Sequence, residues 1–155
     1  MSIPLLSNFD FLDLAKIYNL DIIDCLSQER FVTIKPKKGA YIVNINDGGS
    51  MGHWTCFIIK NNTAIYFDSF GCVPPIPIIK FLKRGHYKLI INRNDIQLLE
   101  GVECGFYCLA FLDYMKKHQR IPCELALRNF TALFKDNTNK NANILQNYIK
   151  DNFPI

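Results

Sequence analysis

The chain has 155 residues, of which 49% are hydrophobic and 13% are aromatic. This length and composition exclude an intrinsically disordered chain and predict one domain, residues 1–155, with its own core. The formal net charge is a modest +4.

The six cysteines are too scattered to predict a disulfide framework, and the N-terminal stretch has no basic region typical of a secretory signal. No apolar run has the length of a membrane span. We therefore expect a protein that is not secreted, has no membrane partner and keeps its thiols free inside a cell. No C-x-x-C pair is present, and none of the three histidines is spaced with cysteines as a zinc site requires, so we expect no metal.

The first predicted element is a helix over residues 9–20, with Asp10 as a candidate N-cap. A strand follows over 40–45, and the loop 46–52 (NDGGSMG) interrupts regular structure. Next come two runs of β-branched and aromatic residues within 53–70, separated by KNNT. This pattern predicts a β-hairpin that turns at Asn61 and Asn62.

The second half of the chain begins with the proline-rich stretch 72–79, which predicts an extended connection. A strand is expected over 87–92, a helix from Cys104 to about Lys117, and closing helices over 123–135 and 143–152. Together these elements predict an α+β fold, in which a small, mostly antiparallel sheet packs on a central helix with flanking helices.

Two cysteines lie one turn apart at the start of this central helix. At Cys104, the unpaired N–H groups and the positive end of the helix dipole favour a thiolate, and Gly105 leaves room for a substrate backbone. Cys108 lies inside the helix and has no such advantage, so we interpret it as a core residue. A buried, inert thiol is the alternative for Cys104 as well.

A nucleophilic cysteine requires a base, and the base requires an orienting group. Among the three histidines, His118 lies at a helix end and His86 lies in a basic connection, whereas His53 opens a strand directly after a glycine-rich loop. Asp68 ends the second strand of the predicted hairpin, so it should lie beside His53 and fix its tautomer. The alternative is that Asp68 only caps a turn.

Gln97 precedes Cys104 by seven residues. Its side-chain amide, together with the backbone N–H of Cys104, would form an oxyanion hole. The alternative is a glutamine on the polar surface.

These residues, in this order, resemble the motifs of the adenovirus-type cysteine proteases, which are related to the proteases of SUMO and other ubiquitin-like proteins. The matching segments are GHW (52–54), YFDSFG (66–71), Gln97 and ECG (103–105). The likeness is strongest to the proteases of virophages and Polinton-type elements, through YIVNIND, FDSFGCVPP and CGFYCLAFL.

The resemblance implies a papain-like core in permuted order, and a catalytic set in which Cys104 is the nucleophile, His53 the base, Asp68 the orienter and Gln97 the oxyanion donor. Gly52, Trp54 and Gly105 would contact substrate, although strand alternation turns Trp54 away from His53. Glu103 would raise the pKa of the thiol if it faced Cys104, so we expect it to point outward.

The resemblance further implies cleavage of viral capsid and core precursors near glycine during virion maturation, by a monomer found in the virion and inside the host cell. No cofactor is needed for the chemistry, although relatives are activated by DNA and by a viral peptide. Removal of ubiquitin-like modifiers is the second enzymatic hypothesis. A non-catalytic module that binds DNA or capsid is the third, suggested by a basic segment without acids: Lys80, Lys83, Arg84, Lys88 and Arg93. A solvated basic face is the alternative for that segment.

Overall fold

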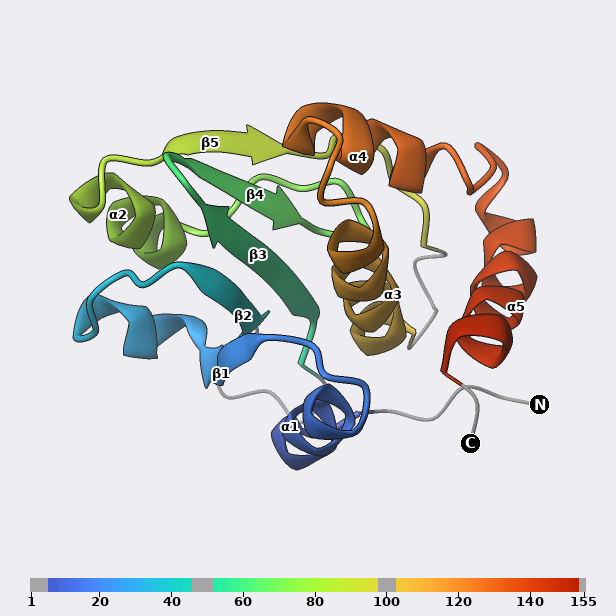
Figure 1. The fold of residues 1–155 in the computed structure, drawn as a ribbon, viewed down its shortest axis with the longest axis horizontal. Helices are drawn as coiled ribbons and strands as arrows, with labels where there is room; N and C mark the ends of the chain where they lie inside the picture. Colours follow the sequence, from blue (N-terminus) through green and yellow to red (C-terminus); the bar gives the residue numbers. More distant parts are fainter. Residues whose placement is uncertain (1–5, 46–51, 98–102, 154–155) are drawn as a thin grey trace.

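The computed structural model describes residues 6–45, 52–97 and 103–153. Within them, a five-stranded sheet is packed between helices (Figure 1). The predicted α+β class is confirmed. The loop predicted over 46–52 lies almost wholly outside the described residues.

The strands follow one another across the sheet in chain order. Their bounds are β1 Ile22–Ser27, β2 Gly39–Asn44, β3 Trp54–Lys60, β4 Thr63–Phe67 and β5 Lys88–Ile91. The two central pairings are antiparallel, as expected, whereas β1 and β5 join the edges in parallel, so the sheet is mixed. The sequence analysis did not predict β1, because its residues IIDCLS carry little of the alternation that marks a half-buried strand.

The predicted hairpin is formed by β3 and β4, with Lys60 opposite Thr63. Asn61 has a φ of +54°, a left-handed conformation that asparagine tolerates better than most residues. This tight turn places the start of β3 and the end of β4 at the same edge of the sheet.

Three helices pack on one face of the sheet, α1 Asn8–Ile17, α3 Cys104–Lys117 and α4 Cys123–Thr131, and α5 Asn141–Asn152 packs against α3. The central helix is α3, as predicted, and most of its residues are buried. Asp10 was expected to be the N-cap of α1, but it is not. Ser7 is the N-cap, and Asp10 completes a capping box by accepting from the Ser7 backbone N–H at 2.8 Å.

The other face of the sheet is covered by α2 (Ile76–Arg84) and a short 3₁₀ helix, η1 (Gln28–Val32), which pack on a second apolar core. A further 3₁₀ turn, η2 (Thr138–Lys140), precedes α5. The extended connection predicted over 72–79 is wrong in its second half, where α2 begins. Pro75 is the N-cap and Pro77 lies in the first turn, where a helix has no need of its N–H groups.

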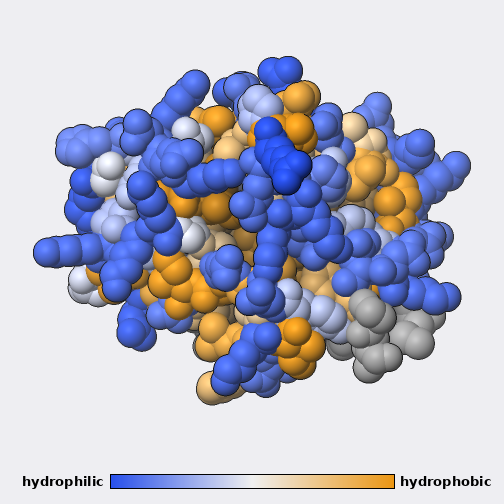
Figure 2. Space-filling model, in the orientation of Figure 1, coloured by the Kyte–Doolittle hydropathy of each residue, from blue (hydrophilic) through white to orange (hydrophobic). Residues whose placement is uncertain are grey.

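Figure 2 shows a largely hydrophilic surface, with apolar side chains visible between the charged ones. Within the described ranges, none of the helices combines the length and the hydropathy that a membrane span needs.

Candidate active site

The site is built at the edge of the sheet where β3 begins and β4 ends. His53 precedes β3 and Asp68 follows β4, and His53 Nε2 lies 2.7 Å from Asp68 Oδ1. The Asp68 side chain is only 1% exposed, against 16% for His53. The backbone N–H of Phe70 donates to the same carboxylate oxygen at 2.9 Å. The carboxylate is thus held in place while it fixes the imidazole.

Asn92, just after β5, holds the backbone of Asp68 from the other side. Its Oδ1 accepts from the Asp68 N–H at 2.9 Å, and its Nδ2 donates to the Asp68 carbonyl at 2.7 Å. Asn92 is 4% exposed. This double contact continues the β4–β5 pairing through a side chain, and so locks Asp68 at the end of its strand.

Cys104 is the first residue of α3 and is 4% exposed. Its Sγ accepts from the backbone N–H of Trp54 at 3.5 Å, and it lies close enough to the His53 side chain to raise the pKa of the imidazole. Because Nε2 of His53 is engaged by Asp68, Nδ1 is the ring nitrogen left for the thiol. His53 therefore lies between Asp68, to which it is hydrogen bonded, and the Cys104 thiol.

Asp68 and Cys104, the two neighbours of His53, determine whether its imidazole is protonated. Burial lowers the pKa of the imidazole, but hydrogen bonds and charge attraction from Asp68 and Cys104 outweigh it and raise the pKa to about 9. An imidazolium at neutral pH is the partner that a thiolate at a helix N-terminus needs. The arrangement places a protonated imidazole beside the Cys104 sulfur.

The ring of Phe70 covers His53, with ring centroids 4.5 Å apart and planes inclined by 22°. A stacked aromatic ring both shields the imidazole from water and attracts it when it is protonated. The sequence analysis did not single out Phe70, although its position two residues after Asp68 in FDSFG was a usable signal. Asn92 was missed too, and a polar residue ending the apolar run YKLIIN was the signal there.

Gln97 is buried, at 1% exposure, and does not lie on the polar surface. Its Oε1 accepts from the hydroxyl of Ser69 at 2.5 Å, and its backbone N–H donates to the Ser69 carbonyl at 3.2 Å. Ser69 directly follows Asp68, so the glutamine is attached to the same strand end that holds His53. Its catalytic role stays a prediction.

Three residues expected to contact substrate have structural roles of their own. The Trp54 side chain is buried against Phe11 and donates from Nε1 to the Leu6 carbonyl at 3.1 Å, so its contact with Cys104 comes from the main chain. A Cβ on Gly52 would lie 2.3 Å from the Asn44 side chain.

The expectation for Gly105 needs correction. A Cβ there would lie 2.8 Å from Cζ of Phe11 and 3.1 Å from Cδ1 of Leu6. The open side of Gly105 is therefore occupied by α1 and the residues before it. The space that the missing side chain leaves at this position is therefore used for close packing between α1 and α3.

Cys108 is completely buried, and its Sγ donates to the Trp54 carbonyl at 3.5 Å. Burial, together with a hydrogen bond to Cys56, raises its pKa well above the usual value. The same helix thus carries one thiol beside an imidazolium and, one turn later, a thiol that stays protonated.

Glu103, the N-cap of α3, is half-exposed and makes no side-chain capping bond. Burial raises the pKa of Tyr107, and the Glu103 carboxylate raises it further. That Glu103 points away from the thiol stays a prediction.

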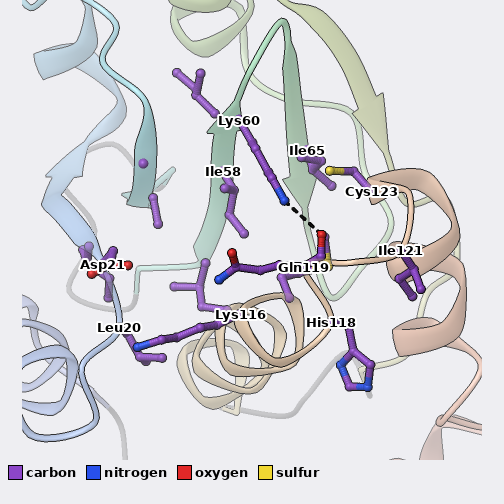
Figure 3. Close-up of a pocket in the computed structure, with 16 residues that line it drawn as sticks. Leu20, Asp21, Ile58, Lys60, Ile65, Lys116, His118, Gln119, Ile121 and Cys123 are labelled. Atoms are coloured by element: carbon purple, nitrogen blue, oxygen red, sulfur yellow. Dashed lines mark hydrogen bonds between the residues drawn. The ribbon is translucent and has the colours of Figure 1, made fainter.

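A separate hollow of about 240 Å³ lies at the opposite end of α3 (Figure 3). A cysteine and a histidine, Cys123 and His118, are among the residues that line it. His118 Nδ1 lies 2.7 Å from the Tyr114 carbonyl, and its ring stacks on Tyr114 with centroids 3.9 Å apart. His118 therefore ends the helix, as expected, and has no base-like contact with Cys123.

The basic segment is only partly available to a polyanion. Arg84 donates to the carbonyls of Phe31, Val32 and Ile34, at 2.6, 3.3 and 2.9 Å, and so ties α2 to η1. The other members are exposed: Lys80, Lys83, Lys88 and Arg93. DNA binding stays a prediction.

The chain matches no protein-family model and no curated protein. Among solved structures it is similar to the ASFV pS273R protease, with 18% identity and a TM-score of 0.58 over 93% of this chain. It spans 66% of the length of that protease. It is also similar to the central domain of the uncharacterized Lpg1148 protein from Legionella pneumophila, with 12% identity, a TM-score of 0.53 and 97% of both chains covered. The chain therefore has a cysteine protease fold, the one seen in the ASFV pS273R protease.

Proposed function

We propose that the chain is a cysteine endopeptidase of the viral kind. The observation that carries the proposal is the position of His53, which is held by Asp68 at 2.7 Å on one side and interacts with Cys104 on the other. Cys104 begins a helix, where the dipole favours the thiolate. The likeness of the fold to the ASFV pS273R protease supports the same reading.

The reaction begins with the Cys104 thiolate, paired with the His53 imidazolium. The thiolate attacks the scissile carbonyl and forms a tetrahedral intermediate. The imidazolium gives its proton to the leaving amine as the C–N bond breaks, which leaves a thioester on Cys104 and a neutral imidazole. His53 then takes a proton from water, which attacks the thioester and releases the acid.

The negative charge on the intermediate needs hydrogen-bond donors. The backbone N–H of Cys104 at the start of α3 is one donor, and the carboxamide of Gln97 is the second. A donor of this kind contributes roughly 10²- to 10³-fold to the rate.

Viral precursor proteins, cut near glycine during virion maturation, are the substrates that the sequence resemblance supports. We propose that the protease works as a monomer, in the virion or in the infected cell. Its chemistry needs no cofactor, because the three side chains and two N–H donors supply every group that the reaction uses.

The direct test is cleavage of a diverse peptide library, with products identified by mass spectrometry. We expect cleavage by the natural chain, none by Cys104→Ala, and unchanged cleavage by the matched control Cys123→Ala. A Cys104→Ala variant that still cleaves would place the nucleophile elsewhere.

Two alternatives predict different results with the same protein. A deconjugating enzyme would cleave ubiquitin-like conjugates faster than precursor-derived peptides. A non-catalytic module would cleave neither, and would bind DNA through the exposed lysines of α2. We expect weak, salt-dependent and sequence-independent DNA binding alongside proteolysis, and a titration at low salt that detects no binding would exclude DNA as an activator.

A further inference from the structure

The strongest unexplained polar contact near the site lies between Ser69 and Gln97. The Ser69 side chain is completely buried, and its Oγ lies 2.5 Å from Gln97 Oε1. A buried hydroxyl costs free energy unless it is paired, so this bond accounts for a serine at a position where an apolar residue would otherwise be expected.

The identity of the two atoms indicates which one donates. The oxygen of a carboxamide only accepts hydrogen bonds, whereas a serine hydroxyl can donate. The Ser69 hydroxyl therefore donates to Oε1 of Gln97.

This donor assignment determines how the carboxamide can act. A carboxamide has an accepting end and a donating end. When Oε1 is bound by Ser69, Nε2 is at the other end, where it can donate to an oxyanion. If the group were turned over, Oε1 would face the developing negative charge and repel it.

Main-chain hydrogen bonds also hold Ser69 beside the segment that carries Gln97. The Ser69 carbonyl accepts from the backbone N–H groups of Ile96 and Gln97, at 2.9 and 3.2 Å. The Ile96 carbonyl accepts in turn from Asn141 Nδ2 at 2.8 Å. The segment that carries Gln97 is thus tied to the end of β4 and to α5.

We propose that Ser69 is a positioning residue for the oxyanion hole, and that its hydroxyl holds the Gln97 carboxamide with Nε2 toward the reacting carbonyl. This inference rests on the proposed function. Asp68 and Ser69 then serve two halves of the same reaction from adjacent positions: Asp68 orients the base, and Ser69 orients the oxyanion donor.

The test compares two reactions of Cys104. In acylation by p-nitrophenyl acetate, the thiolate adds to the ester carbonyl and p-nitrophenolate leaves, so an oxyanion forms on the way. In alkylation by iodoacetamide, the thiolate displaces iodide directly and no oxyanion forms. Damage to the thiolate or to the fold slows both reactions, whereas damage to the oxyanion hole slows only the first.

For Ser69→Ala we expect acylation to slow by at least about tenfold, and for Gln97→Ala by roughly 10²- to 10³-fold, with alkylation of Cys104 unchanged in both. The double variant should be no slower than Gln97→Ala alone, because Ser69 acts only through Gln97. The matched control is Thr131→Val, which removes another buried hydroxyl, bonded to the Arg128 carbonyl at 3.0 Å, and should leave both rates unchanged.

The outcomes separate the two proposals. Equal slowing of both reactions in Ser69→Ala, no slowing of either, or a further loss in the double variant would overturn the role of Ser69 alone. If the natural chain shows no selective reaction of Cys104 with either reagent, the proposed function itself fails.

Discussion

The two ends of α3 carry similar residue types and differ in how these residues are connected. At the N-terminal end, Cys104 interacts with His53, and the imidazole of His53 is hydrogen bonded to Asp68. At the C-terminal end, roughly 20 Å away for a helix of 14 residues, Cys123 and His118 line one hollow, but His118 is bonded to its own helix.

The difference shows that a cysteine, a histidine and a hollow do not by themselves make a reactive site. Two lysines near the C-terminal end are likewise bound to the backbone. Lys60 donates to the Gln119 carbonyl at 3.2 Å, and Lys116 donates to the Asn19 carbonyl. These two lysines join backbone segments, whereas at the N-terminal end the side chains act on one another.

The largest effect is expected from breaking the connection at Asp68. Asp68→Asn removes the charge that attracts the imidazolium, so peptide cleavage should fall by roughly 10²- to 10⁴-fold. The pKa of His53 should drop from about 9 toward 6.5, which NMR can follow because the chain has only three histidines. An unchanged pKa would mean that Asp68 does not control the base.

The same connection should make stability depend on pH. The pKa of His53 is raised in the folded state, so its contribution is complete below pH 6.5 and is lost as the pH rises through about 9. At roughly 1.4 kcal/mol per pH unit, the interval from pH 6.5 to about 9 sets an upper limit of roughly 3–4 kcal/mol on this contribution. Urea unfolding between pH 6 and pH 10 measures this contribution as a change in the free energy of unfolding. A free energy of unfolding that changes with pH neither in the natural chain nor in Asp68→Asn would contradict the account.

A smaller effect is expected from Gly105→Ala. Overpacking against Phe11 and Leu6 should cost roughly 1–3 kcal/mol, partly offset by about 1 kcal/mol of better helix propensity. A net loss of about 1 kcal/mol in the free energy of unfolding is therefore expected. A more stable variant would show that α1 yields easily and that the packing explanation for this glycine is wrong.

The smallest effect is expected at the C-terminal end of α3. Lys60→Ala removes one bond to a carbonyl on the surface, so stability should change by no more than about 0.5 kcal/mol and cleavage should not change. A large loss of cleavage in this variant would show that the two ends of the helix are coupled.

The sequence predicted the parts of this structure that depend on local patterns. The hairpin followed from strand alternation around Asn61 and Asn62, and the start of the central helix followed from its apolar face after Cys104. The hairpin in turn implied that Asp68 approaches His53, because a tight turn leaves little choice of register.

The remaining features depend on contacts between distant segments, which no local pattern reports. Ser69 and Phe70 look like turn residues until β4 is placed beside Gln97 and His53. Gly105 reads as space for a ligand until α1 is packed against it. The helix after Pro75 was missed because proline is unfavourable inside a helix but acceptable in its first turn.

The most direct test of the central claim is site-resolved alkylation of the free thiols by iodoacetamide near pH 7. Cys104 is 4% exposed, whereas Cys72 is exposed, and partial desolvation with the nearby charges of Asp68 and Asp95 raises the pKa of its thiol. If His53 holds Cys104 as a thiolate, the buried cysteine reacts before the exposed one, and Asp68→Asn reduces that preference. Faster labelling of Cys72, or slow labelling of Cys72 and Cys123 with none at Cys104, would contradict the account.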